Sequence, residues 1–220
     1  KKKRKAVEIS MAFAFVNRGR IMRRPMRIVL ASGSPRRREL LEQIGIRAEV
    51  IPSSVEEKVT STVPEQVVLE LSGQKAEDVA AGIDGDGVLV IGADTVVSSE
   101  GRILGKPASE EEAEEMIRSL AGKSHQVYTG VTLIWKEPSG ETKRSSFAEG
   151  TDVFVYPMEE EEIRAYARCG EPMDKAGAYG IQGRFAAYVE KIEGDYSNVV
   201  GLPVGRLYQE IKKLTGGWKA

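Results

Sequence analysis

The sequence has few of the residues on which redox, zinc and triad chemistry depend. Its 220 residues include one cysteine, Cys169, and one histidine, His125. A single cysteine excludes an intrachain disulfide framework and suits a reducing compartment, so we expect a cytoplasmic protein. A single histidine leaves no strong candidate for a histidine-rich zinc site or a Ser-His-Asp triad. We therefore interpret both residues as structural.

Long apolar runs and the common phosphate-loop motifs are missing as well. No apolar run approaches the roughly 20 residues of a membrane-spanning helix, so we expect no membrane partner. Neither a Walker A motif nor a GxGxxG motif is present. The 23 glycines follow no period, and 41% of the residues are hydrophobic. This composition is typical of one globular core, or of two lobes around a cleft.

Positive charge is concentrated at the start of the chain. The formal net charge is −1, yet residues 1–27 contain ten lysines and arginines and a single acidic residue, Glu8. The basic run at residues 1–5 resembles a nuclear-localisation or nucleic-acid-binding tail. A solvated tail, or translated sequence upstream of the true start, explains it as well. We predict that residues 1–25 are a disordered or non-native extension of a folded domain at residues 26–220.

From Met26 onward, strand-like apolar runs alternate with helical patterns, which indicates an α/β fold. The clearest helix begins after Ser109, where Glu112 completes a capping box, and it ends at Gly122. The irregular order of elements favours a mixed twisted sheet with flanking helices over a Rossmann arrangement. We expect strands at about 27–31, 48–51, 88–97, 126–135, 143–156 and 185–192, and further helices at 36–44, 64–81, 159–169 and 204–214.

The first candidate site is the turn that joins the first strand to the first helix. Ser34 is a natural N-cap, and Pro35 suits the first helical position. Free backbone N–H groups and the positive end of the helix dipole would meet there, which favours an anion. Arg36 and Arg37 add fork-shaped donors that fit phosphate oxygens. A basic, solvated helix start is the alternative explanation.

The second candidate is Asp94, within the most apolar segment of the chain. A buried carboxylate is costly unless it is paired or binds a metal, so Asp94 could be a Mg²⁺ ligand or a general base. A strand-end turn former explains it equally well. Gly92 leaves room for a ligand or another backbone to approach. Glu57 would help to form an oxygen-ligand site if the two carboxylates converge.

Two further segments offer polar groups to a ligand. Lys106 lies in a rigid Gly-Lys-Pro turn that suits a fixed phosphate partner, whereas Lys75 is commonplace on its own. The glycine-rich segment 171–183 suits a nucleobase or a ribose, although an ordinary surface loop would look similar. The residues alone therefore predict a cleft for phosphate, base and divalent metal, without naming a reaction.

Five segments of the sequence resemble the Maf nucleotide pyrophosphatases, in that family's order and spacing. They are ASGSPRR at 31–37, GADTVV at 92–97, LGKP at 104–107, DKAGAYGIQG at 174–183 and YSNVVGLP at 196–203. The resemblance covers about residues 26–215. It implies a two-lobed α/β fold around a central cleft, a homodimer, and hydrolysis of nucleoside triphosphates to monophosphate and pyrophosphate. The GADT and GIQG motifs resemble those of the subgroup that acts on dTTP and UTP.

The resemblance also implies a role for individual residues. Asp94 corresponds to the central catalytic carboxylate, with Glu57 beside it at a divalent metal (Mg²⁺, Mn²⁺ or Co²⁺). Lys106 is implied to be catalytic, and Gln182 to help choose the base. The chain departs from the family pattern near Lys75, where Gly73 could loosen the helix. Substrate binding is implied for the remaining set: Ser32, Ser34, Arg36, Arg37 and Lys75.

Three other functions remain open at this level. The first is a pyrophosphatase for noncanonical purine or 7-methylguanosine triphosphates, which base selectivity would separate from the pyrimidine enzyme. The second is a nucleotide-sensing inhibitor of septum formation, which would bind nucleotide without turning it over. The third is nucleic-acid binding through the basic tail, which truncation before Met22 would abolish. We do not expect this last function.

Overall fold

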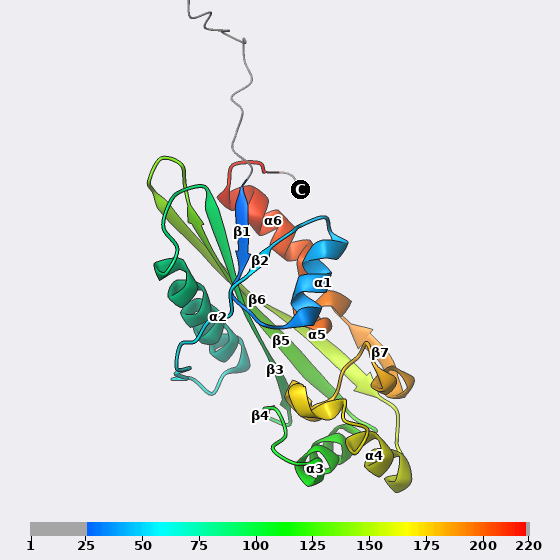
Figure 1. Cartoon of the computed structure of the whole chain (residues 1–220). Helices are drawn as coiled ribbons and strands as arrows, with labels where there is room; N and C mark the ends of the chain where they lie inside the picture. The colour runs from blue at the N-terminus through cyan, green and yellow to red at the C-terminus, as the bar shows by residue number, and fades with distance from the viewer. Residues whose placement is uncertain (1–25, 219–220) are drawn as a thin grey trace, which may run out of the picture.

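The computed structural model describes residues 26–218, so the predicted basic extension of residues 1–25 lies outside the described residues. A seven-stranded mixed sheet runs through the molecule (Figure 1). Its order is β2 (Glu49–Val50), β1 (Arg27–Leu30), β3 (Val88–Ser99), β5 (Ser124–Lys136), β6 (Thr142–Val155) and β7 (Val189–Glu193), with β4 (Arg102–Leu104) beside β3. Strand β1 is parallel to β2 and β3, and the other pairs are antiparallel. The predicted mixed sheet is confirmed.

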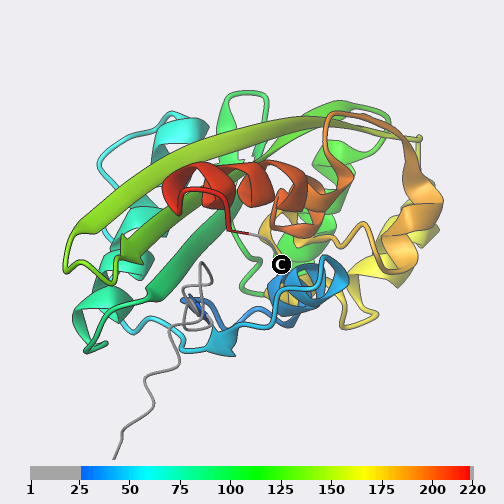
Figure 2. The same ribbon diagram turned by 90° about the horizontal axis from the view of Figure 1, so that it is seen from above.

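Helices cover both faces of this sheet (Figures 1 and 2). Helix α2 (Pro64–Ala81) covers one face, and α1 (Pro35–Gln43), α5 (Tyr196–Val200) and α6 (Val204–Leu214) cover the other. Helices α3 (Glu110–Leu120) and α4 (Glu160–Ala167) pack together at the far end of the long strands. We call the part of the molecule that contains α1 and α2 the α2 lobe, and the part that contains α3 and α4 the α3 lobe. Strands β3, β5 and β6 run through both.

The alternation of side chains along β3 explains how one strand supports both faces. Leu89 and Ile91 belong to the large apolar cluster under α1 and α6. Val88 and Val90 point the opposite way, into a smaller cluster under α2. All four side chains are buried. A continuous apolar run is expected for a strand that is covered on both faces, since successive side chains alternate between them.

Two glycines allow α2 to lie directly on the sheet. A Cβ on Gly92 of β3 would meet the carbonyl oxygen of Ser72 at 2.3 Å, and one on Gly130 of β5 would meet that of Val68 at 2.2 Å. Side chains at these positions would push the helix away from the strands. The sequence left open whether a ligand or another backbone approaches Gly92, and the structure shows that it is the backbone of α2. This close approach fixes the height of α2 above β3.

The clearest predicted helix is confirmed in detail. Ser109 is the N-cap of α3, and its hydroxyl accepts a hydrogen bond from the Glu112 N–H at 3.2 Å. The Glu112 carboxylate reaches back to the N–H of Ala108, one residue earlier than in a standard capping box. The apolar face of α3 is buried in the large hydrophobic cluster of the protein.

The predicted strand at 185–192 is partly wrong. Residues Arg184–Tyr188 form a 3₁₀ turn, and β7 begins only at Val189. The turn inserts Phe185, which is fully buried, between the rings of Tyr166 and Tyr179. A strand would alternate its side chains and could not bury this ring in the same way. The short elements β4 and α5 were not predicted.

None of the helices within residues 26–218 has the length and apolar character to span a bilayer.

Candidate active site

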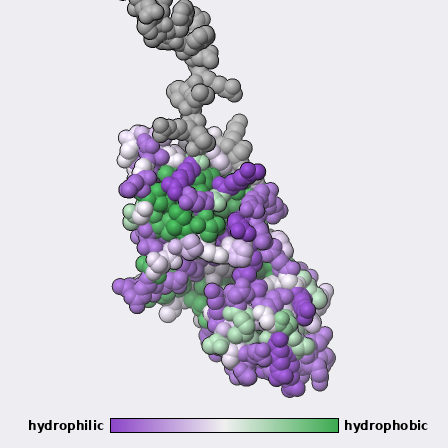
Figure 3. Space-filling view, in the orientation of Figure 1, coloured by the Kyte–Doolittle hydropathy of each residue, from purple (hydrophilic) through white to green (hydrophobic). Residues whose placement is uncertain are grey.

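A cleft of about 690 Å³ lies where the two lobes meet. The β1–α1 turn and α2 contribute to it from the α2 lobe, and the Lys106 turn and segment 171–183 contribute from the α3 lobe. In the space-filling view the region between the lobes is mainly hydrophilic (Figure 3). All nine residues that sequence reasoning placed in a site line this one cleft: Ser32, Ser34, Arg36, Arg37, Glu57, Lys75, Asp94, Lys106 and Gln182.

The β1–α1 turn presents an open helix start to the cleft. Ser34 is the N-cap and Pro35 the first helical residue, as predicted, but the Ser34 side chain makes no capping hydrogen bond. The Ser32 hydroxyl instead accepts a hydrogen bond from the Ser34 N–H at 3.3 Å. The first-turn N–H groups of α1 therefore have no side-chain partner from the cap, and an anion could take that place.

Arg37 connects three separate parts of the cleft wall. Its side chain is buried, and Nε donates to the carbonyl of Gly201 at 2.8 Å. Nη1 donates to the Ser32 hydroxyl and to the Ala93 carbonyl, and Nη2 donates to Thr95 Oγ1 at 3.0 Å. Burial lowers the pKa of Arg37, an effect that the nearby Asp94 carboxylate opposes. One of its five N–H donors remains for a ligand, so its hydrogen bonds mainly hold the turn, β3 and the end of α5 together.

Lys75 lies between the two predicted metal carboxylates. Its ammonium is 2.5 Å from Asp94 Oδ1 and 2.9 Å from Glu57 Oε1. Asp94 belongs to the sheet, Lys75 to α2, and Glu57 to the long loop before α2. The two carboxylates therefore converge on one cation position. Among the described residues, no cluster of three or more His, Cys, Asp or Glu side chains is placed to hold a metal ion.

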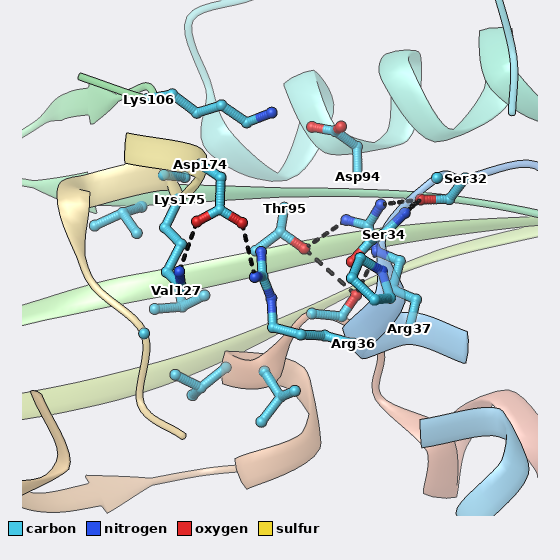
Figure 4. Close-up of a pocket in the computed structure, with 18 of the residues that line it drawn as sticks. Ser32, Ser34, Arg36, Arg37, Asp94, Thr95, Lys106, Val127, Asp174 and Lys175 are labelled. Carbon is cyan, nitrogen blue, oxygen red and sulfur yellow. Dashed lines mark hydrogen bonds and ion pairs between the residues drawn. The ribbon is translucent and has the colours of Figure 1, made fainter. Parts of the chain in front are cut away.

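The two segments from the α3 lobe are attached to each other. The N–H of Gly177 donates to the carbonyl of Gly105 at 3.0 Å, which ties the glycine-rich segment to the turn that carries Lys106. The Lys106 side chain points into the cleft (Figure 4), and no carboxylate within residues 26–218 lies within 4.0 Å of its ammonium. Gln182 lies in an exposed turn at the edge of the same cleft.

Glu171 holds the turn that carries Gln182. One carboxylate oxygen accepts from the hydroxyl of Tyr166 at 2.9 Å, and the other accepts from the N–H of Arg184 at 3.0 Å. A Cβ on Gly183 would meet the same carboxylate at 2.1 Å, so a side chain there would displace the Glu171 carboxylate. Sequence reasoning did not single out Glu171. The signal was faint, because a lone glutamate before a proline has no pattern of its own.

Asp174 and Lys175 also reach into the cleft, beside Arg36 (Figure 4). Arg36 Nη1 donates to Asp174 Oδ2 at 3.1 Å, and Lys175 Nζ donates to Asp174 Oδ1 at 2.6 Å. Arg36 belongs to the α2 lobe and Asp174 to the α3 lobe, so this ion pair crosses the cleft. Sequence reasoning noted that this segment is polar but did not connect it with Arg36, 138 residues away.

The comparisons with known proteins point to one family. The model of the family described as "Maf-like protein" matches residues 27–214. A dTTP/UTP pyrophosphatase of Agathobacter rectalis is 54% identical over 198 residues, covering 85% of this chain and 97% of that protein. A dTTP/UTP pyrophosphatase of Carboxydothermus hydrogenoformans is 55% identical over 188 residues, covering 86% of this chain and 98% of that protein.

Among solved structures, the Ham1 protein of Staphylococcus aureus matches with a TM-score of 0.40 at 20% identity, over 59% of this chain and 71% of that chain. The family model spans nearly all the described residues and every wall of the cleft. This chain belongs to the Maf family.

Proposed function

We propose that this chain hydrolyses dTTP and UTP to the nucleoside monophosphate and pyrophosphate. The observation that carries the proposal is the convergence of all nine predicted site residues on one cleft, in a chain 54–55% identical to relatives named dTTP/UTP pyrophosphatase. That convergence supports this cleft as the place of the proposed reaction.

The cations of the cleft suit a triphosphate. Arg36, Lys75, Lys106 and Lys175 reach it from both lobes, and the start of α1 opens toward it. A triphosphate carries several negative charges, and hydrolysis adds charge to the pyrophosphate as it leaves. Fixed cations in a sheltered cleft stabilise such developing charge without having to reorganise.

The carboxylate pair suits a divalent cation. Asp94 and Glu57 already share one ammonium, that of Lys75, so their oxygens can surround a single cation. Mg²⁺ is usually held by one or two carboxylates together with substrate phosphates, and this donor set fits. When bound, such an ion would neutralise phosphate charge and polarise the phosphoryl oxygens. Lys75 would then leave the carboxylates and turn its ammonium to the phosphates.

Asp94 is the residue that we assign to the attacking water. Its side chain is about 15% exposed and opens into the cleft from the middle of β3. Once Lys75 has moved, its carboxylate can accept the proton of a water that attacks the α-phosphorus opposite the leaving pyrophosphate. Glu57 lies nearer the surface, with about half of its side chain exposed, and would orient ligands more than take protons.

Base selection is assigned to Gln182, whose amide lies at the exposed edge of the cleft. An amide offers both a donor and an acceptor, which the Watson–Crick edge of thymine or uracil can match.

The free thiol of Cys169 suits a reducing compartment, which supports our proposal of a cytoplasmic protein. The homodimer, and the absence of nucleic-acid binding, remain predictions.

A substrate panel tests the proposed function. The purified protein is incubated with Mg²⁺, Mn²⁺ or Co²⁺ and with dTTP, UTP, CTP, ITP or 7-methyl-GTP, and products are separated by ion exchange. We expect pyrophosphate from dTTP and UTP, and its loss in Asp94→Asn. Turnover of purine analogues alone would contradict the role of Gln182. Nucleotide binding without any turnover would favour the sensing function instead.

A further inference from the structure

Asp174 is the acidic residue of the cleft that neither the proposed reaction nor the metal requires. Its carboxylate lies between two cations, Arg36 and Lys175, with one oxygen bonded to each. These partners lower the pKa of Asp174, against the opposing effect of its partial burial, so it carries a negative charge at neutral pH. The close-up shows this carboxylate in the space between the two basic side chains (Figure 4).

The pairing pattern of the whole cleft sets Asp174 apart. Asp94 and Glu57 share Lys75, the residue nearest the predicted metal position. The Glu171 carboxylate accepts from Tyr166 and from a backbone N–H, and only the backbone carbonyl of Glu171 accepts from Lys175, at 2.6 Å. Only Asp174, among the carboxylates that line the cleft in the described chain, bonds to basic side chains of both lobes.

We propose that Asp174 is an internal competitor of the substrate phosphates, which holds Arg36 and Lys175 until a phosphate group displaces it. The two carboxylate oxygens occupy the donors that two phosphate oxygens would otherwise use. A phosphate oxygen that takes either of these donors must displace the Asp174 oxygen bonded to it. Asp174 thereby weakens the binding of substrate and product alike, and it favours the release of product. The proposal rests on the proposed function in taking this cleft as a phosphate site.

The exposure of the three side chains makes displacement feasible. The Asp174 side chain is 62% exposed, so once displaced it can turn to solvent at little desolvation cost. Arg36 and Lys175 are less exposed, at 28% and 15%, so their charges stay in the cleft and need an anion. Asp174 is therefore the side chain that moves when a phosphate binds, whereas Arg36 and Lys175 stay in the cleft.

The direct test is the binding of inorganic pyrophosphate, measured by calorimetry, to the intact protein and to Asp174→Asn. Asparagine keeps the size of the side chain but removes the charge that competes. Since exposed ion pairs are individually weak, we expect roughly three- to tenfold tighter binding in the variant. We also expect this difference to shrink at high salt, because screening weakens the internal pairs.

Two further variants separate competition from other causes. Glu49→Gln removes the same charge from an exposed ion pair with Arg27, away from the cleft, and should leave pyrophosphate binding unchanged. In an Arg36→Gln background, Asp174→Asn should give a smaller gain, since one of the two blocked cations is gone.

Unchanged or weaker pyrophosphate binding in Asp174→Asn would overturn the proposal, as would an equal gain in Glu49→Gln. None of these measurements requires turnover. Failure to hydrolyse dTTP would therefore defeat the proposed function while leaving this inference intact. Normal hydrolysis of dTTP, with no change in pyrophosphate binding in Asp174→Asn, would support the proposed function and overturn the inference about Asp174.

Discussion

The ammonium of Lys75 lies 2.5 Å from Asp94 Oδ1, and both residues line the cleft. Asp94 sits in the middle of an otherwise apolar strand, and Lys75 comes from a helix that two glycines bring against that strand. Such a partner compensates the cost of placing a carboxylate in an apolar part of the protein. The same ammonium also occupies the position that we propose for a divalent cation.

Lys75→Met should therefore have opposite effects on metal binding and on turnover. Without the ammonium, Asp94 and Glu57 are free to bind Mn²⁺, so we expect tighter binding of Mn²⁺ to the nucleotide-free protein. The kcat/KM for dTTP should fall about 100-fold, because the Lys75 ammonium no longer stabilises the phosphates. Electron paramagnetic resonance of Mn²⁺ and steady-state kinetics check the two effects. Unchanged Mn²⁺ affinity would show that Lys75 does not occupy the metal position.

Gly92→Ala should disturb the site through α2, because Gly92 and Asp94 face the same side of the sheet. The added methyl would meet the Ser72 carbonyl at 2.3 Å and the backbone of Ala76 at 2.8 Å, next to Lys75. We expect a loss of about 1–3 kcal/mol in the free energy of unfolding, together with lower activity. Urea unfolding measures the first effect. Gly82→Ala is the matched control, because its methyl meets only ordinary contacts at 3.7 Å; equal losses in both variants would contradict the close-approach account.

Glu171→Gln should relax base selection. The amide would place a donor where a carboxylate oxygen now accepts a hydrogen bond from Tyr166 or Arg184. The turn that carries Gln182 would loosen, and the ratio of kcat/KM for dTTP over dCTP should fall several-fold. Glu193→Gln, an exposed change with a neighbouring lysine partner, serves as the control. A fall in overall rate with an unchanged ratio would show that Glu171 does not position Gln182.

His125 should make the fold sensitive to mild acid. Burial lowers the pKa of this histidine to about 4, an effect that Asp152 opposes, and its ring bonds to the hydroxyl of Tyr179. The unfolded chain binds the proton with a pKa of about 6.5. The stabilisation is thus complete above pH 6.5 and is lost as the pH falls toward 4, in total on the order of 3 kcal/mol.

Urea unfolding between pH 7.5 and 4.5 measures this dependence. His125→Gln keeps a hydrogen-bonding side chain but does not titrate, so its free energy of unfolding should fall less steeply over that range. Parallel profiles for the two proteins would show that other groups cause the loss of stability.

The sequence predicted the fold well where the pattern is local. Helix α2 begins and ends at the predicted residues, and the capping residue of α3 was identified, because N-caps and helical spacing can be recognised within a few residues. The turn around Phe185 was wrong because its conformation depends on the aromatic rings of α4 and the glycine-rich segment, which are brought there by the fold.

In the candidate site as well, the sequence predicted what depends on a local pattern and missed what depends on distant contacts. Asp94 could be found from its own segment, since a carboxylate in an apolar strand is conspicuous. The ion pair between Arg36 and Asp174, and three of the four hydrogen bonds of Arg37, connect residues that are far apart in the sequence. No local pattern records which distant carbonyl or carboxylate a buried arginine will meet, so these relationships required the structure.

In the proposed reaction, water attacks the α-phosphorus and pyrophosphate leaves. Hydrolysis of dTTP in water labelled with oxygen-18, followed by mass spectrometry of both products, shows which phosphorus the water attacks. We expect one labelled oxygen in dTMP and none in pyrophosphate, with the reaction lost in Asp94→Asn. Label in the pyrophosphate, or release of labelled orthophosphate and dTDP, would contradict it.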